Sequence, residues 1–405
     1  MSPLERDYRL DYDLGEPELN ERWDDVVADL HDGGGCPVAR SDVGEGYWIV
    51  NRYDDVVRCA KDWQTFTASS GFMVNRPEGL PYFAPGEADP PLHAQLRAAL
   101  DPFLRPSVVR GLQDTIRATA DALIDKFIAD GHTDVVASFA NPLPQAIFSV
   151  ELAGMDPADM PFLLKTFSLS GPMEERGPNF AKGMAKIEEY LRRRSQDPSR
   201  GDIVDALLAF EHPDYGWTGK VGTLSQLTIG GIGTTGYVFA GGLHHLATHP
   251  IDRRLLIEDP DRIGRALDEF LRFYMGAPNM ARRATVDVEL GGTPIRAGDR
   301  VLLSFGAASR DPAVTERPNV VDITRRQVRH LAFGAGNHRC IGASLARPIL
   351  KIGFEQFLRR IPDFAVPDGF EPRHETGNTR HMLELPLLFT PGSRSSSDVA
   401  VEVST

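Results

Sequence analysis

The 405-residue sequence has few cysteines, and they form no spacing pattern. Cys36, Cys59 and Cys340 are an odd number in a long chain, so we expect reduced thiols, no disulfide and no iron–sulfur cluster built into the chain. Zinc is also a poor fit, because His338 and Cys340 are too close for the usual pair and no second cluster completes four ligands.

Basic charge and long apolar runs are scarce as well. The chain has 44 Lys and Arg against 57 Asp and Glu, a formal net charge of -13, which disfavours nucleic acid and anionic membranes as partners. No apolar run reaches membrane-spanning length, and residues 1–14 lack the apolar core of a signal peptide. We therefore expect a cytoplasmic protein.

One stretch, residues 333–342, places a single thiol inside a glycine-rich turn. Glycines let the backbone adopt positive φ and approach a flat ligand closely. Cys340 lies where a helical pattern begins, so unpaired amides can hold a thiolate. The thiol can be interpreted as a cofactor ligand or as a buried inert residue, which is the commoner case for an isolated cysteine.

The pattern Phe-Gly-x-Gly-x-His-x-Cys-x-Gly, with all its fixed positions present from Phe333 to Gly342, resembles the haem-ligand loop of cytochrome P450. The resemblance implies haem b (iron protoporphyrin IX), with Cys340 as the metal ligand. It implies a mainly α fold with small β-sheets, in which the haem lies between a long central helix and the cysteine loop. It also implies a single domain over residues 1–390, which leaves a serine-rich tail, 391–405, that we expect to be disordered.

The resemblance also assigns residues to the haem propionates. His93 and Arg97 lie four apart on one face of a predicted helix, a pair that is usually a solvated surface but is similar to the family's His-x-x-x-Arg site. Alignment with the family makes Arg282, rather than Arg283, the second propionate ligand. His338 is the third group implied there.

The segment 227–243 contains six glycines, and helix propensity alone predicts a loop. Its length, its apolar character and its end at Pro250 favour a helix against which something large presses. It resembles the long helix that crosses the haem, with Gly230 and Gly231 where that helix opens to admit dioxygen. Thr234 then matches the oxygen-activating hydroxyl of the family.

Gly233 departs from the family pattern, because most monooxygenase members carry Asp or Glu immediately before that threonine. The acid normally helps to relay protons. Three explanations stay open: a water chain or another side chain substitutes, the enzyme accepts peroxide, or its reaction needs no such relay, as in relatives that reduce nitric oxide. Thr234 favours the first. A non-catalytic haem-binding sensor or carrier and a cofactor-free helical interaction protein remain as alternatives of other classes.

Glu269 and Arg272 form a Glu-x-x-Arg pair, which is commonplace alone but resembles the structural pair below the haem in this family. The third partner usually comes from a Pro-x-Arg-Phe-like segment. Here Val320 stands where that arginine belongs, so Arg317 or Arg325 is expected to replace it.

The resemblance implies a monooxygenase with separate electron donors. No nucleotide-binding glycine fingerprint follows a strand, so a ferredoxin and its reductase are implied as partners of a monomeric enzyme. Four basic residues near the cysteine loop suit docking of an acidic iron–sulfur protein, although solvated surface arginines are an equal interpretation: Arg329, Arg339, Arg347 and Lys351.

A small or medium, mainly apolar substrate is expected, because the residues predicted to contact it are mostly apolar: Phe72, Met73, Ile229, Ile232, Ala277 and Pro278. The irregular stretch 69–88 is either a lid over such a pocket or a packed surface loop. Arg76, Arg380 or His381 would bind a substrate carboxylate if they faced inward.

Several elements follow from local patterns. Asp89 is the predicted N-cap of the helix that contains His93. Residues 212–222 read as a polar loop, residues 285–290 and 295–303 as two strands joined by a turn, and residues 383–389 as a strand. Residues 345–361 read as a helix that Pro348 should bend.

Overall fold

The computed structural model describes residue 4 and residues 7–31, 38–74, 76, 79–167, 173–197 and 200–395. These residues belong to two compact units, which are described separately. Unit 1 contains residues 1–95, 268–340 and 374–380, and unit 2 contains residues 96–267, 341–373 and 381–405.

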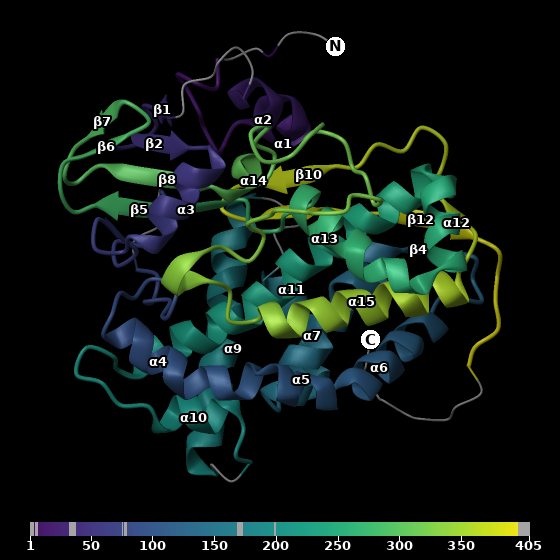
Figure 1. Cartoon of the computed structure of the whole chain (residues 1–405). Coiled ribbons are helices and arrows are strands. Elements are labelled where there is room, and N and C mark those ends of the chain that lie inside the picture. The colour runs from purple at the N-terminus through teal and green to yellow at the C-terminus, as the bar shows by residue number, and fades with distance from the viewer. Residues whose placement is uncertain are drawn as a thin grey trace. The chain divides into compact units, whose positions relative to one another are not determined.

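A five-stranded sheet organises unit 1, and Figure 1 shows its longer strands side by side. β2 and β8 are parallel neighbours, and the other pairs are antiparallel. In sheet order the strands are β1 (Val38–Ser41), β2 (Tyr47–Val50), β8 (Arg300–Ser304), β5 (Asn279–Ala284) and β3 (Phe66–Thr67).

Both faces of this sheet are buried. Alternate side chains of β2 and β8 point to opposite faces, and a helix packs on each face. Val50 and Leu303 pack with α3 (Tyr53–Lys61) on one face. Ile49 and Leu302 pack with α2 (Trp23–His31) on the other. The remaining elements of unit 1 are α1 (Pro17–Glu21), β6 (Val288–Leu290), β7 (Thr293–Ile295), α14 (Phe305–Ala308), η6 (Gly336–His338) and β10 (His374–Thr376).

The two strands predicted at 285–290 and 295–303 differ from those observed. β6 is shorter than predicted, and the second strand is split into β7 and β8, which belong to different sheets. The break is a turn in which Asp287 accepts from the Ala297 amide (2.9 Å) and Gly298 adopts a φ of +96°. Side-chain acceptors and a left-handed residue therefore end a pattern that alternation alone would continue.

Unit 2 is helical, and its longest helix is α11 (Trp217–Thr248), which contacts α7, α9 and α15. The polar loop predicted at 212–222 is wrong in its second half, because α11 begins at Trp217. The Trp217 indole donates to Glu188 (3.1 Å), and the Lys220 ammonium donates to the Leu208 carbonyl (2.6 Å). These bonds allow polar residues to form the first turns of a largely buried helix.

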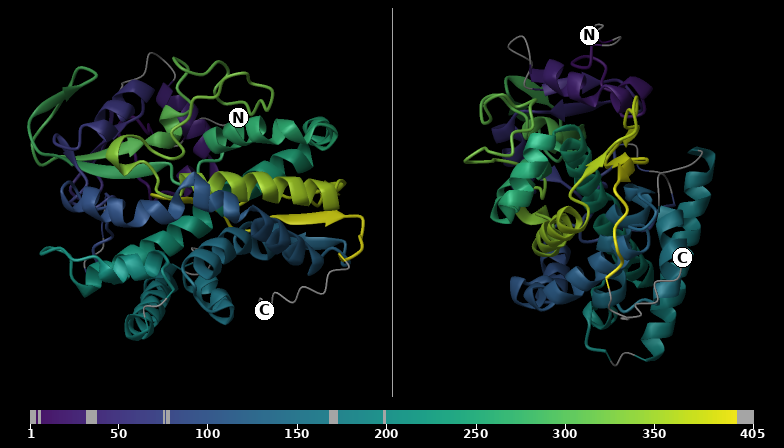
Figure 2. Two further views of the ribbon diagram at one scale, coloured as in Figure 1. Left: turned by 60° about the horizontal axis from the view of Figure 1, so that its bottom comes forward. Right: turned by 90° about the vertical axis from the view of Figure 1, so that its right-hand side faces the viewer.

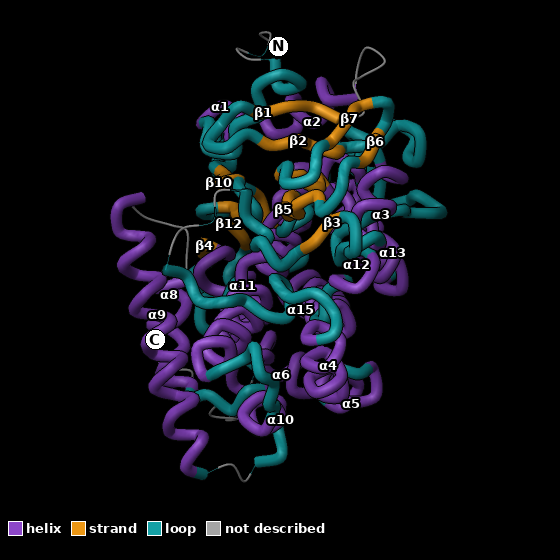
Figure 3. The backbone as a smooth tube through the Cα atoms, turned by 90° about the vertical axis from the view of Figure 1, so that its left-hand side faces the viewer, coloured by secondary structure: helices purple, strands orange, loops and turns teal. Residues whose placement is uncertain are grey.

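Of the other helices of unit 2, α10 and α12 also contact α11. Figure 2 shows α15 beside α6, and Figure 3 shows α8 beside α9. Their bounds are α5 (Pro106–Gly111), α6 (Gln113–Asp125), α7 (Pro142–Gln145), α8 (Met160–Phe167), α9 (Met173–Gln196), α10 (Ile203–Ala209), α12 (Pro250–Glu258) and α15 (Ala343–Arg360). Two π-helical segments, η2 (Val136–Ala140) and η3 (Ala146–Leu152), flank α7. A small sheet has the order β4 (His132–Asp134), β12 (Pro386–Phe389) and β9 (Phe364–Ala365).

Three elements lie where the chain passes between units: α4 (Leu92–Leu100), α13 (Ile263–Phe273) and β11 (Arg380–Met382). α4 begins three residues after the predicted N-cap, because the Asp89 carboxylate accepts from the Thr67 hydroxyl and the Ala68 amide instead. The strand predicted at 383–389 is present only as β12.

At the carboxyl end, the Gly392 amide donates to Ile128 (2.9 Å) and the Ser395 amide to Asp125 (2.9 Å). The rest of the tail predicted to be disordered, 396–405, lies outside the described residues, as does Cys36. Neither Cys59 nor Cys340 forms a disulfide within the described part of the chain. In the described part of the chain, no helix combines the length and the apolar character that a membrane crossing requires.

Candidate functional site

The cysteine loop is closed by its own backbone. The Cys340 amide donates to the Phe333 carbonyl over 2.8 Å, and Gly334 donates to Leu331 over 2.8 Å. Gly334 and Gly336 have φ values of +66° and +67°, the left-handed region that favours glycine. The loop therefore presents Cys340 as an exposed residue at its end.

Gly336 also seats the loop against α3. A Cβ atom at this position would lie 2.9 Å from the carbonyl carbon of Ala60, well inside ordinary contact distance. Position 336 thus requires glycine both for its backbone angle and for the close approach of α3. Sequence reasoning identified the glycine, but not the helix that it meets.

Two histidines predicted at the propionates lie together in unit 1. The rings of His93 and His338 have centroids 4.6 Å apart. Asp89 lies beside them, 4.0 Å from Nε2 of His338. Arg97, which follows one turn later in α4, forms an ion pair with Asp101 at 2.7 Å, so its propionate role stays a prediction.

Arg282 is a buried cation, and among the described residues no carboxylate forms an ion pair with it. Its guanidinium donates to the Ala281 carbonyl over 2.7 Å, and burial lowers the pKa of Arg282 to about 10. Arg283 differs, because it is more exposed and pairs with Glu45 at 2.9 Å. A buried guanidinium without a paired carboxylate fits an incoming propionate, which would supply the missing negative charge.

On α11 the predicted oxygen-activating residue has a defined partner. The Thr234 hydroxyl donates to the Gly230 carbonyl over 2.6 Å, and the helix is continuous through Gly230 and Gly231. A Cβ atom on Gly230 would meet nothing within 4 Å. One on Gly233 would lie 2.7 Å from Nδ1 of His381, a contact that no pattern in the sequence predicts.

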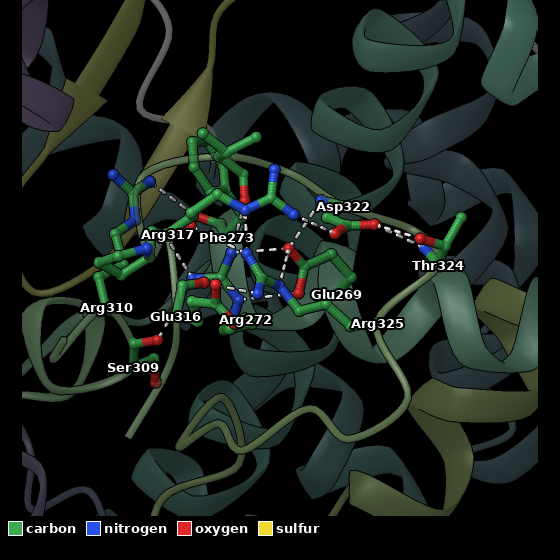
Figure 4. A network of polar contacts seen from close by, with 12 residues as sticks. Glu269, Arg272, Phe273, Ser309, Arg310, Glu316, Arg317, Asp322, Thr324 and Arg325 are labelled. Atoms are coloured by element: carbon green, nitrogen blue, oxygen red, sulfur yellow. Dashed lines mark hydrogen bonds and ion pairs between the residues drawn. The ribbon is translucent and has the colours of Figure 1, made fainter. Parts of the chain in front are cut away.

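The Glu269–Arg272 pair is fully buried and has a third partner (Figure 4). Arg272 binds both carboxylate oxygens of Glu269, at 2.7 and 2.8 Å, and Arg325 binds one of them at 3.1 Å. Arg325 is therefore the stand-in, whereas Arg317 pairs with Asp322. Val320 contributes its backbone carbonyl, which accepts from Arg272 over 3.1 Å.

The stretch 69–88 is irregular, as predicted, but parts of it are anchored in unit 1. The Phe72 carbonyl accepts from the Ala281 amide (2.7 Å) and from the Asn378 side chain (2.8 Å). Arg300 donates to the Ser70 carbonyl over 3.1 Å. The backbone around Phe72 is thus fixed to the sheet, and only its side chain is left for a ligand.

The other predicted substrate residues vary in burial. Met73, Ile229 and Ala277 are half-buried, and Ile232 and Pro278 are buried.

Two of the residues considered for a substrate carboxylate have partners elsewhere. Arg76 forms a 2.8 Å ion pair with buried Glu87. Arg380 lies over the Trp23 ring at 5.4 Å, and its amide donates to the Gly276 carbonyl.

A mainly helical fold with small sheets, a long central helix and a cysteine loop directly before the last long helix defines the class of haem-thiolate oxidoreductases. The crystal structure of cytochrome P450 CYP101C1 matches with a TM-score of 0.83 at 27% identity, over 94% of this chain and 98% of that one. A family model described as cytochrome P450 matches residues 157–375.

Curated relatives agree with this class. Nocardicin C N-oxygenase of Nocardia uniformis subsp. tsuyamanensis is 33% identical over 90% of this chain and 97% of its own length. Steroid C26-monooxygenase of Mycolicibacterium smegmatis is 28% identical over 86% and 89%. The chain belongs to the cytochrome P450 family and is a haem-dependent monooxygenase.

Proposed function

We propose that this enzyme hydroxylates a small or medium, mainly apolar organic compound, with two electrons from a ferredoxin and its reductase. We further propose that it works in the cytoplasm as a monomer with one P450 domain, 1–390. The observation that supports this function best is the closed glycine-built loop that presents Cys340. The net reaction joins substrate R–H, O₂, two electrons and two protons to give R–OH and water.

Haem b is the proposed cofactor; the Cys340 thiolate would bind its iron, and Phe333, Gly342 and Gly230 are the other residues proposed to contact it. Thiolate-ligated haem supplies reductive activation of dioxygen, because sulfur pushes electron density toward the iron. The proposed propionate donors are His93, Arg97, Arg282 and His338, of which Arg282 has the clearest electrostatic need for a carboxylate.

Other residues of the chain orient a hydroxyl for proton transfer and stabilise the backbone of unit 1. The hydroxyl of Thr234 is oriented by its bond to Gly230, so its oxygen is left to accept from a further donor. Arg272 and Arg325 donate to the Val320 carbonyl, and Glu269 accepts from the Asp322 amide, which fixes this segment of unit 1. We propose a structural role for this network.

Support for a ferredoxin partner comes from a local group of basic side chains on a chain that is acidic overall. Arg117, Arg347 and Lys351 line one hollow of about 240 Å³ in unit 2, together with Glu355, which pairs with Lys351. Positive side chains gathered at one place would steer an acidic iron–sulfur protein. Arg347 and Lys351 were predicted from the sequence, and Arg117 was not.

The substrate remains to be identified by experiment. One relative is named for N-oxygenation and another for oxidation of a steroid carbon, so a screen should contain amines as well as hydrocarbons. A compound that displaces water from the iron shifts the haem absorption toward shorter wavelength, and this shift is the readout.

The deciding test is the absorption of the reduced protein under carbon monoxide. We expect the red-shifted band of sulfur ligation in the wild type and its loss in Cys340→Ala. A band that persists in Cys340→Ala would overturn the assignment. A colourless wild-type protein would indicate the interaction protein instead, and a haem protein that no compound shifts would favour the sensor or carrier.

Peroxide-driven oxidation is a second candidate, favoured by Gly233 in place of the usual acid. Product formation with hydrogen peroxide alone, at a rate above that with ferredoxin, reductase and NADH, would establish it. Reduction of nitric oxide by NADH without product from any organic compound would identify the other atypical reaction.

A further inference from the structure

The ring of His381 occupies the space that a side chain at position 233 would fill. A Cβ atom on Gly233 would lie 2.7 Å from Nδ1 and 3.4 Å from Nε2 of His381. The imidazole therefore lies directly against α11, at the residue where most family members carry an acid. An aspartate could enter only if the ring moved away.

The backbone is anchored in unit 2 on the carboxyl side of His381, which itself lies in β11. Four residues after it, the Leu385 amide donates to Asp134 over 2.9 Å and the Leu385 carbonyl accepts from Val135 over 3.0 Å. β12 then pairs with β4. Hydrogen bonds and strand pairing thus fix the backbone on the carboxyl side of His381.

A second polar side chain lies on the same side of α11. Gly236 is three residues from Gly233, so both face the same way on the helix. A Cβ atom on Gly236 would lie 3.1 Å from the amide carbon of Asn141. Gly230 instead borders open space, so close polar packing is confined to one stretch of the helix.

The imidazole can do what the missing carboxylate would do. Burial lowers the pKa of His381 to about 4, so the ring is neutral near pH 7. A neutral imidazole accepts a hydrogen bond at one nitrogen and donates at the other. If it takes a proton at one nitrogen, it releases one from the other, and the ring ends with the charge that it had at the start.

We infer that His381 takes the place of the acid before Thr234, as a positioning residue that keeps a polar, proton-passing group beside this turn of α11. The inference rests on the proposed monooxygenase function and specifies how it is achieved without an acid at position 233. It also explains why position 233 is glycine, because the ring of His381 occupies the space that a larger side chain would fill.

The steric part is tested by thermal unfolding of the purified holoprotein. Gly233→Ala should lower the melting temperature by several degrees, whereas the same change in a His381→Ala background should lower it by less than one degree. Gly177→Ala, inside α9, where an added Cβ atom would meet nothing within 4 Å, is the control and should not lower it. An equal effect of Gly233→Ala with and without His381 would overturn the inference.

The chemical part is tested by product formed and peroxide released per NADH, with a surrogate ferredoxin and reductase and a substrate from the haem-shift screen. His381→Ala should lower the product-to-peroxide ratio at least fivefold, and His381→Gln, whose amide forms hydrogen bonds but does not exchange a proton near pH 7, should lower it as well. Gly233→Asp alone should not help, whereas Gly233→Asp in the His381→Ala protein should restore the ratio.

The affinity for the compound, taken from the haem shift, should change by less than threefold in each variant. An unchanged ratio in His381→Ala would overturn the inference, and so would a loss matched by an equal loss of affinity, which would make His381 a substrate contact. Absence of the carbon monoxide band from the wild type would instead overturn the proposed function.

Discussion

Arg282 and Arg283 are neighbours on β5 whose side chains face opposite sides of a strand. One is buried without a paired carboxylate among the described residues, and the other pairs with Glu45. Burial disfavours the charged form of Arg282, as its lowered pKa shows, so the protonated side chain destabilises the haem-free protein at neutral pH. A propionate opposite it would offset this cost.

Arg282→Leu should therefore have different effects on the stability of the haem-free protein and on haem binding. The haem-free protein should be no less stable than wild type in urea unfolding, while the haem content of the purified protein should fall at least fivefold. Arg283→Leu is the control and should leave the haem content within about 20% of wild type, because its pair with Glu45 is exposed. Equal haem loss in both variants would contradict a special role for Arg282.

Gly334 and Gly336 have the same backbone angle but different neighbours. Gly334→Ala should cost about 1 to 2 kcal/mol for its left-handed backbone alone. Gly336→Ala should cost more, because its Cβ would also meet the carbonyl group of Ala60. Unfolding free energies of the two variants check this order, and a Gly334 variant that is the less stable of the two would refute it.

At the scale of elements, α13 is tied to the segment around Val320 by Glu269. This carboxylate is fully buried, and it binds Arg272, Arg325 and the Asp322 amide. Glu269→Gln leaves buried arginine charge without its counter-ion, which should lower the free energy of unfolding by about 3 to 5 kcal/mol.

The control for this change is Arg317→Ala in the same segment. Its ion pair with Asp322 is solvent-exposed, so the variant should lose less than about 1 kcal/mol in the same urea titration. A Glu269→Gln protein as stable as Arg317→Ala would show that the network contributes little.

The elements that sequence periodicity predicted well are those with one dominant apolar pattern, such as α15. Its predicted span of 345–361 differs from the observed Ala343–Arg360 only at the ends, with Pro348 inside. The start of α11 was missed because its polar residues are satisfied by Glu188 and Leu208, which no local pattern shows. Helix and strand ends set by distant side chains are hidden from local patterns.

At the scale of the whole molecule, the chain has a net charge of -13, yet several basic residues lie together at the hollow that contains Arg347. The rate of reduction by an acidic ferredoxin should fall about tenfold between low and high salt if these residues steer it. Arg347→Glu should weaken this salt dependence and slow reduction at low salt. Arg373→Glu, outside the hollow, is the control, and an equal effect of both would exclude steering through Arg347.

The family and the cysteine loop could be predicted from the sequence because they depend on residue type and spacing within a short segment. The choice of Arg325 over Arg317 could not, since it depends on which arginine reaches Glu269 after folding. The contact between His381 and Gly233 could not either. It joins residues of β11 and α11 that lie far apart in the chain and meet only after folding.

β2 pairs in parallel with β8, with Trp48 opposite Val301, so this part of the sheet cannot form until β8 has been synthesised. While the ribosome is still making the helices in between, β1 and β2 lack their central partner strand, and their apolar side chains stay exposed to solvent. The thiol at position 340 emerges later still. Loading of the prosthetic group is therefore an event near the end of translation or after it, and a nascent chain stalled before residue 300 should be a client for chaperones.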